Sequence, residues 1–190
     1  MIITLVVILL YVVLFAIALF CAVYYPIRMI SLFMSDHYGA PFVPLEPDIV
    51  DRMVSLAHLQ AGQKVYDLGS GDGRILFRAV READVTACGY EIAIYPYILC
   101  RLRLWQRRSK HERISVERRN FFKQDLASAD VIFLYQLPKV LLGLRDKFLS
   151  ELRPGTIVIS ARFAFDDWVP GSIDRSLKHP IYVYHVPQRG

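Results

Sequence analysis

The first 27 residues lack any charged side chain, although the whole chain has 23 Lys and Arg residues and 18 Asp and Glu residues. The net charge of +5 therefore belongs to the residues from Arg28 onward. The first 25 residues are apolar almost throughout. A helix of that length, at about 1.5 Å per residue, can cross a hydrocarbon core of about 30 Å. The sequence predicts a transmembrane anchor over residues 1–27.

The sequence also lacks the features of a cleaved secretory signal. Such a signal has basic residues before its apolar core and a small-residue cleavage site after it, but this chain has no Lys or Arg before Arg28, and AVYYPIRMI is a poor cleavage site. Tyr24 and Tyr25 suit the membrane interface, and Pro26 and Arg28 mark the exit. Because every basic residue follows the apolar segment, we expect a single-pass protein whose C-terminal part lies in the cytoplasm, or on the matrix side of a mitochondrial membrane.

Cysteine and histidine are few, with three and five residues, and neither shows the spacing of a metal site. We therefore expect no metal centre. Cys21 lies inside the apolar segment, and Cys88 and Cys100 stand alone. This usage is typical of a reducing compartment, where thiols serve as small apolar side chains.

The rest of the chain divides into a connector and one domain. Residues 28–45 contain Gly39, Pro41 and Pro44 and predict a juxtamembrane linker. From residue 46 to residue 190, short apolar runs alternate with segments of helical periodicity. We expect helices over 47–59, 73–83, 95–108 and 139–152, strands over 64–68, 85–91, 114–118, 130–137 and 156–163, and an antiparallel pair within 172–186. This order predicts an α/β domain with a Rossmann-like, seven-stranded, mostly parallel sheet and helices on both faces.

A glycine-rich turn follows the first expected strand. Asp67 stands two residues before Gly69, and Gly71 and Gly73 follow at alternate positions. Glycines let a backbone turn tightly and approach a ligand, and the helix start that comes next has free N–H groups. A dinucleotide fingerprint would need glycine where this chain has Arg74, and the Gly-Lys-Ser/Thr of a phosphate loop is absent.

The pattern D-x-G-x-G-x-G resembles motif I of the S-adenosylmethionine-dependent methyltransferases with a Rossmann-like sheet. The resemblance implies that Asp67 lies near the methionine part of the cofactor and that Gly69, Gly71 and Gly73 pass close to its sugar. It also implies a second acid after the second strand, which accepts hydrogen bonds from the ribose hydroxyls. Glu91 has both the position and the chemistry for that role.

Six segments resemble, in the same order, a narrower group: the membrane-anchored lysine methyltransferases that act on the mitochondrial ATP synthase c-subunit and on the adenine nucleotide translocator. The segments are PFVPLEPDIVDRMVSLA, VYDLGSGDGRI, CGYE, NFFKQDL, DVIFLYQLP and ISARFAFDDWVP. That group usually has Thr or Ser where this chain has Leu45 and Glu46, and Asn-Pro where it has residues 92–94. These differences leave the cofactor inference intact but do not identify the acceptor, and a bacterial relative would fit equally well.

A lysine acceptor must lose a proton before it reacts. Its reference pKa of about 10.4 makes this cost about 4.6 kcal/mol at neutral pH, and an apolar entrance lowers that pKa. We expect Tyr135 and Gln136, after the fourth strand, to be catalytic residues that accept a hydrogen bond from the amine. Pro138, Phe163 and Trp168 are further candidates for the entrance, with core and loop packing as the alternative.

The residues after the third strand lie near the adenine in this fold. We expect Asn120 to hydrogen-bond the base and Phe121 to stack on it. Alternatively, Asn120 makes only a turn.

Residues 101–119 hold eight Lys and Arg residues against Glu112 and Glu117. One interpretation is a solvated helix face, and the other is a contact with anionic lipid next to the anchor. Ile98, Leu102 and Trp105 share one side of the expected helix, which indicates that Trp105 packs into the protein. No RNA-binding module accompanies the run, so nucleic acid is disfavoured as a partner.

The function favoured by these residues is a membrane-anchored S-adenosylmethionine-dependent N-methyltransferase that acts on a protein lysine, with an integral membrane protein as a possible substrate because the anchor raises its local concentration. A methyltransferase for a lipid or small molecule would use the same cofactor site. A non-catalytic membrane adaptor that binds the cofactor is the alternative from another class, and the intact acids and glycines argue against it.

Overall fold

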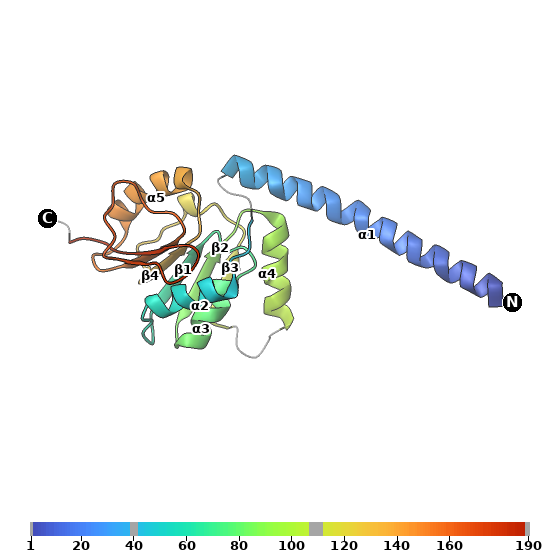
Figure 1. The fold of residues 1–190 in the computed structure, drawn as a ribbon, viewed down its shortest axis with the longest axis horizontal. Helices are drawn as coiled ribbons and strands as arrows, with labels where there is room; N and C mark the ends of the chain where they lie inside the picture. Colours follow the sequence, from blue (N-terminus) through green and yellow to red (C-terminus); the bar gives the residue numbers. More distant parts are fainter. Residues whose placement is uncertain (1, 39–41, 107–111, 189–190) are drawn as a thin grey trace.

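The structure is a computed structural model that describes residues 2–38, 42–106 and 112–188 (Figure 1). Within these residues seven strands form one sheet of order β3-β2-β1-β4-β5-β7-β6. The strands are β1 (Lys64–Leu68), β2 (Thr86–Tyr90), β3 (Ile114–Glu117), β4 (Val131–Leu134), β5 (Ile157–Ala161), β6 (Ser172–Asp174) and β7 (Ile181–His185). The helices are α1 (Ile2–Tyr38), α2 (Pro47–Leu56), α3 (Arg74–Glu82), α4 (Ile94–Gln106), the 3₁₀ turn η1 (Phe121–Lys123) and α5 (Pro138–Glu151). The predicted α/β fold class and the seven-stranded sheet are confirmed.

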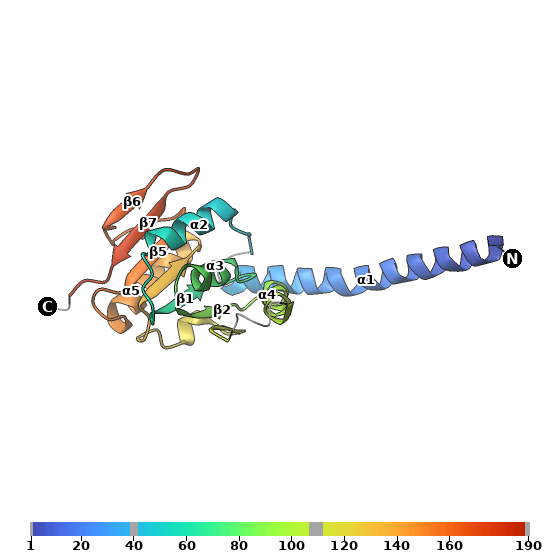
Figure 2. The same ribbon diagram turned by 90° about the horizontal axis from the view of Figure 1, so that it is seen from below.

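Helix α1 projects from the domain as a long arm (Figures 1 and 2). Within the described residues, one stretch, Ile2–Ile30, is long and apolar enough to cross a membrane, and an 18-residue window within it has a mean hydropathy of 3.2. The helix continues through Pro26 to Tyr38, so the first part of the expected linker is helical. Residues 39–41, which include Gly39 and Pro41, lie outside the described residues.

The central strands follow from their composition. All four residues of β4 are buried, because the strand has neighbours on both sides and is covered on both faces. The strand predicted over 130–137 is shorter in the structure: it ends at Leu134, and residues 135–137 form the loop before α5. Strands β1 to β5 are parallel, and β7 pairs antiparallel with β5 and with β6.

Helices cover the two faces of the sheet in separate layers. Helices α2, α3 and α4 contribute to one apolar core, and α5 contributes to the other (Figure 1). Val65 of β1 belongs to the first core and Leu68 to the second. This alternation along each strand is what a sheet with two covered faces requires.

The order of the strands reverses direction between β1 and β4. The chain leaves β1 toward β2 on one side and later returns to β4 on the other, so the loops after these two strands part at this point. Such a divergence leaves a crevice at the carboxyl ends of the strands, where ligands of open α/β sheets bind. Asp67 is the register partner of Phe133, which puts the glycine turn and residues 135–137 at the same sheet edge.

Candidate active site

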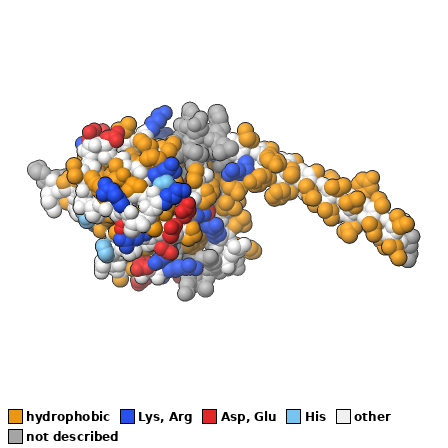
Figure 3. Space-filling view, viewed as in Figure 1, with side chains coloured by type: hydrophobic (Ala, Val, Ile, Leu, Met, Phe, Trp, Pro, Cys, Tyr) orange, Lys and Arg blue, Asp and Glu red, His pale blue; other side chains and the backbone are white. Residues whose placement is uncertain are grey.

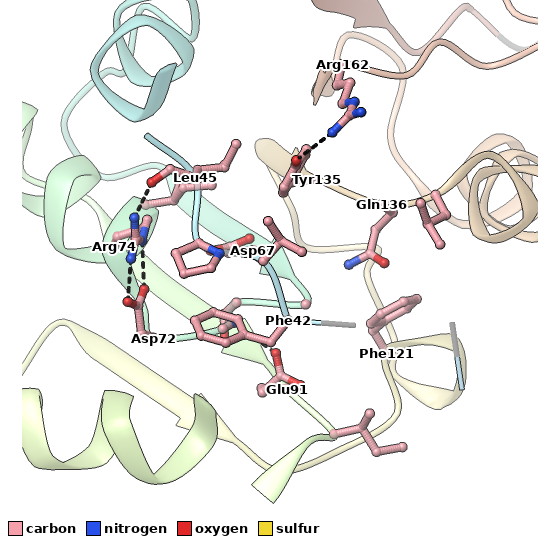
Figure 4. A pocket seen from close by; sticks show the side chains of 18 of the residues that line it. Phe42, Leu45, Asp67, Asp72, Arg74, Glu91, Phe121, Tyr135, Gln136 and Arg162 are labelled. Carbon is pink, nitrogen blue, oxygen red and sulfur yellow. Dashed lines mark hydrogen bonds and ion pairs between the residues drawn. The ribbon is translucent and has the colours of Figure 1, made fainter. Parts of the chain in front are cut away.

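A cleft of about 1090 Å³, including its open mouth, lies at this edge of the sheet (Figure 4). Six segments supply its walls: Phe42–Leu45, the glycine turn with Asp67, Glu91 and Ile92 after β2, Phe121, Tyr135–Leu137 after β4, and Arg162 and Phe163 after β5. Of the residues proposed from the sequence, the cleft brings together Asp67, Gly69, Gly71, Glu91, Phe121, Tyr135, Gln136 and Phe163.

The turn after β1 needs glycine at two of these positions. Gly69 has φ of 87° and Gly71 has φ of 56°, both in the left-handed region. A Cβ on Gly69 would overlap the Nε2 of Gln136, and one on Gly71 would lie 2.6 Å from the ring of Phe42. The turn is therefore closely covered by side chains from two other segments, and any side chain of its own would displace them.

Glu91 is held at the end of β2 by backbone donors. Its carboxylate accepts hydrogen bonds from the N–H of Gly71, at 2.9 Å, and from the N–H of Ala93, at 2.7 Å. Burial raises the pKa of Glu91, and these backbone bonds oppose that rise. Each carboxylate oxygen has a further lone pair, so Glu91 can accept two hydroxyl donors from the cleft without losing its backbone bonds.

Asp67 is 3% exposed and lies beside the glycine turn. Burial, and then the charges of Glu91 and Asp72, raise its pKa well above the ordinary value. A group with these properties favours a ligand that brings positive charge or hydrogen-bond donors into the cleft, because such a ligand stabilises the ionised carboxylate.

A network around Asp72 connects the glycine turn to neighbouring segments. Arg74 donates to both carboxylate oxygens of Asp72, at 2.9 and 2.6 Å, and Arg103 of α4 lies 2.9 Å from the same group. Burial raises the pKa of Asp72, but the hydrogen bonds and charge of Arg74 and the charge of Arg103 lower it below its usual value. Arg74 also donates to the main-chain oxygen of Leu45 (Figure 4). The network thereby ties the segment before α2 to the glycine turn.

Another wall of the cleft lies at the ends of β4 and β5. Gln136 is 7% exposed, and its Nε2 donates to the main-chain oxygen of Leu68 at 2.8 Å. The Tyr135 hydroxyl lies 3.5 Å from Nη1 of Arg162 (Figure 4). Arg162 has φ of 71°, which is rare for a residue with a side chain, and its guanidinium lies 5.2 Å from the centre of the Phe163 ring.

Four candidates from the sequence have other positions. The Oδ1 of Asn120 accepts a hydrogen bond from the N–H of Phe122 at 2.9 Å, so Asn120 caps η1 and does not line the cleft. Trp168 packs against Phe165 and Tyr184, with ring centres 5.3 and 5.0 Å away.

Pro138 and Gly73 each begin a helix. Pro138 is the first residue of α5, where its fixed φ suits a helix start. Gly73 precedes α3 with φ of 80° and lies against Cys100. Neither residue lines the cleft.

Other residues of the cleft were not predicted. Phe42–Leu45 and Arg74 come together through tertiary contacts, which no local pattern reveals. Arg162 follows β5 directly, so the rule that ligands bind at carboxyl ends of strands was the one signal that could have indicated it.

Comparison with known proteins agrees with this geometry. The model of the ANTKMT methyltransferase domain matches residues 67–172. A protein-lysine N-methyltransferase of Saccharolobus islandicus (strain REY15A) is 34% identical over 77% of this chain and 93% of its own. The adenine nucleotide translocase lysine N-methyltransferase of Mus musculus is 31% identical over 79% of this chain and 65% of its own. The ATP synthase c-subunit lysine N-methyltransferase of Homo sapiens is 30% identical over 70% of this chain and 56% of its own.

A crystal structure of an RNA methyltransferase from Salinibacter ruber, in complex with S-adenosyl-L-homocysteine, is 32% identical with a TM-score of 0.74. The match covers 78% of this chain and 96% of that one. The sheet order, the cleft at its reversal point and this match define an S-adenosylmethionine-dependent methyltransferase. The chain belongs to the ANTKMT methyltransferase domain family, which confirms the resemblance seen in its six segments.

Proposed function

We propose that this chain is a membrane-anchored N-methyltransferase that transfers a methyl group from S-adenosylmethionine to a lysine of a protein. The observation that supports it best is the pairing of two buried acids, Asp67 and Glu91, across a glycine turn in a cleft whose other side is aromatic and polar. Three relatives in this family carry names of protein-lysine N-methyltransferases.

The residues present fit the methyl donor. Asp67 would hold its positively charged methionine end, and Glu91 its ribose hydroxyls. Gly69 and Gly71 give the turn beside that sugar its left-handed conformation, and Phe121 offers a ring for the base. When bound, the donor supplies an electrophilic methyl group: a carbon–nitrogen bond forms as the carbon–sulfur bond breaks, and the amine releases one proton.

The chain must present the amine unprotonated and in line. Arg162 places a positive charge at the mouth of the cleft, and like charge lowers the pKa of an incoming lysine. The Tyr135 hydroxyl and the Gln136 carbonyl oxygen can each accept a hydrogen bond from the amine and orient its lone pair. The rings of Tyr135 and Phe163 exclude water from this side.

The anchor supports a substrate at the membrane. The apolar stretch Ile2–Ile30 suits a single crossing, with the domain on the cytoplasmic or matrix side. Two relatives are named for the adenine nucleotide translocase and for the ATP synthase c-subunit. We infer that the acceptor is a lysine on an integral membrane protein, close to the bilayer surface. The described part of the basic run, residues 101–106 and 112–119, would add attraction to anionic lipid.

Methyl transfer from labelled S-adenosylmethionine tests this function. The chain of residues 1–190 is incubated with native membranes, which are then separated into protein, lipid extract and RNA. We expect the label in protein, as methylated lysine after hydrolysis. Label in the lipid extract would favour the alternative of a lipid methyltransferase. Tight cofactor binding without transfer to any fraction would favour a non-catalytic adaptor.

A further inference from the structure

Helix α4 has two apolar faces, and the sheet covers one of them. Tyr97, Cys100 and Leu104 pack against the core. On another side of the helix Ile98 is 41% exposed, Leu102 50% and Trp105 63%. These three residues, called here the outer stripe, follow the i, i+4, i+7 spacing of a single helix face. The expectation that Trp105 packs into the protein is therefore wrong, because periodicity does not tell which of two apolar faces meets the core.

The outer stripe continues from the contact between α4 and the anchor. Tyr95, one turn before Ile98, meets the ring of Tyr24 edge-on with ring centres 6.0 Å apart. The guanidinium of Arg28 lies 4.8 Å above the same Tyr95 ring. Tyr24 and Arg28 stand where the apolar segment ends and the first charge appears. This is the level at which aromatic and basic side chains meet the surface of a bilayer.

The orientation of α4 relative to α1 keeps the outer stripe at the level of the membrane surface. Figures 1 and 2 show α4 at the edge of the domain from which α1 projects, and Figure 1 shows it lying across the direction of α1. If α1 crosses the membrane, α4 then runs along the membrane surface and does not point away from it. Figure 3 shows hydrophobic side chains at this edge, next to the arm.

The charges of α4 also suit a lipid surface. The helix contains Arg101 and Arg103 and no acidic residue. Arg101 is exposed and stands three residues after Ile98 and four before Trp105, beside the outer stripe, so its long side chain can reach the headgroups while the stripe enters the apolar region. Arg103 is bound to Asp72 and faces the cleft wall.

We propose that α4 is an interfacial helix whose outer stripe inserts at the boundary between headgroups and acyl chains of the bilayer that α1 crosses. The proposal rests on the membrane anchor of the proposed function. It has a consequence for the site, because α4 starts two residues after the cleft residue Ile92 and binds Asp72 through Arg103. Docking of α4 would fix the cleft close to the bilayer and select acceptor lysines near its surface.

Quenching of Trp105 by lipid tests this directly. The chain has two tryptophans, so the Trp168→Phe variant leaves Trp105 as the single reporter. The full chain is placed in nanodiscs of phosphatidylcholine and phosphatidylserine, with or without lipids brominated near the headgroup end of the acyl chain. We expect a blue-shifted Trp105 emission that the brominated lipid quenches. The Trp105→Phe variant, which reports on Trp168, should not be quenched.

Two matched substitutions separate the stripe from other exposed apolar residues. Leu102→Glu in the single-tryptophan background should abolish lipid quenching. Leu142→Glu should leave it unchanged, because Leu142 is 55% exposed on α5, outside the stripe. Far-UV circular dichroism and the affinity for S-adenosylhomocysteine should be the same in both variants, which shows that each is folded.

Three outcomes would overturn the proposal. Trp105 could stay open to acrylamide and unquenched by lipid while alkaline carbonate leaves the chain in the membrane, in which case the anchor stands and the interfacial helix does not. Trp105 could be shielded only in nanodiscs that hold two copies, which would assign the stripe to a dimer. Alkaline carbonate could release the chain, and then the anchor itself fails.

Discussion

Gln136 donates a hydrogen bond from its Nε2 to the main-chain oxygen of Leu68 at 2.8 Å, and this bond joins the loop after β4 to the end of β1. The same amide lies directly over Gly69. The loop after β4 and the glycine turn are thus in contact, so a substitution in one alters the packing of the other. Because both elements line the cleft, the contact couples the site expected to bind the donor to the site expected to bind the amine.

Gly69→Ala should weaken binding of S-adenosylmethionine by at least about tenfold, measured by calorimetric titration. The new Cβ meets Gln136, and φ of 87° costs about 1–2 kcal/mol for a residue with a side chain. Gly62→Ala is the matched control, since Gly62 has φ of 84° with open space around it. It should lower the melting temperature and leave cofactor binding unchanged. Equal affinity in the two variants would show that the glycine turn does not contact the donor.

Cofactor affinity should rise with pH in the range where Asp67 of the free protein loses its proton. Burial, then Glu91 and Asp72, raise the pKa of Asp67 well above 3.8, and a cationic donor binds the ionised form. Below the raised pKa, binding must release a proton, so the dissociation constant falls by up to about tenfold per pH unit as the pH rises. Calorimetry in buffers of different ionisation enthalpy measures that proton. Asp67→Asn should bind more weakly and release fewer protons.

The stability of the protein without cofactor should fall as the pH rises through the same range, whereas cofactor affinity rises. The folded pKa of Asp67 is raised above the unfolded value, so its contribution to stability is complete below about 3.8 and is lost as pH rises through the folded pKa. Asp67→Asn removes this loss. The melting temperature of the variant, relative to the parent, should therefore increase with pH across the same range. A constant difference would show that Asp67 titrates normally.

Arg74→Ala should raise the Michaelis constant for S-adenosylmethionine more than it lowers kcat. Arg74 binds both Asp72 and the main-chain oxygen of Leu45, and its loss frees the segment that covers Gly71 through Phe42. Arg78→Ala, on the same helix, removes ion pairs with Asp51 and Glu82 outside the cleft and should leave both constants unchanged. If the two variants behave alike, the network around Asp72 serves only the stability of α3.

Tyr135→Phe should lower kcat by about tenfold, the effect of one lost hydrogen bond in the transition state. Cofactor binding should stay within about twofold, because the hydroxyl points to the acceptor side, near Arg162. Tyr182→Phe makes the same chemical change on β7, outside the cleft residues, and should not alter the rate. An unchanged kcat in Tyr135→Phe would remove this hydroxyl from the mechanism.

The sequence predicted the fold because its strands and helices have clear local signals. The apolar run of β4 and the alternation of elements gave the sheet, and the spacing of Asp67 and Glu91 gave the two acids of the cleft. Prediction was weaker where a residue has two local solutions. The Oδ1 of Asn120 caps its own turn at 2.9 Å, which was the alternative to a contact with the base.

Contacts between distant segments had no local signal. Phe42 reaches the glycine turn, and Arg74 binds Leu45 across 29 residues of sequence, only because α2 and α3 pack together on one face of the sheet. The positive φ of Arg162 is a feature of the same kind. Arg162 directly follows β5, and its N–H donates to the main-chain oxygen of Pro180, just before β7, at 2.7 Å. These features needed the folded structure.

The central claim is that Asp67 and Glu91 hold S-adenosylmethionine across the glycine turn. The most direct measurement is calorimetric titration of S-adenosylmethionine and S-adenosylhomocysteine into the parent chain and into Glu91→Gln, with Glu82→Gln, exposed at the end of α3, as the control. Glu91→Gln keeps the shape of the side chain but replaces one acceptor oxygen with a donor. It loses an acceptor for the ribose hydroxyls and one of the two backbone bonds, from Gly71 or Ala93, so it should bind both ligands at least about tenfold more weakly. Parental affinity in a folded Glu91→Gln protein would contradict the account.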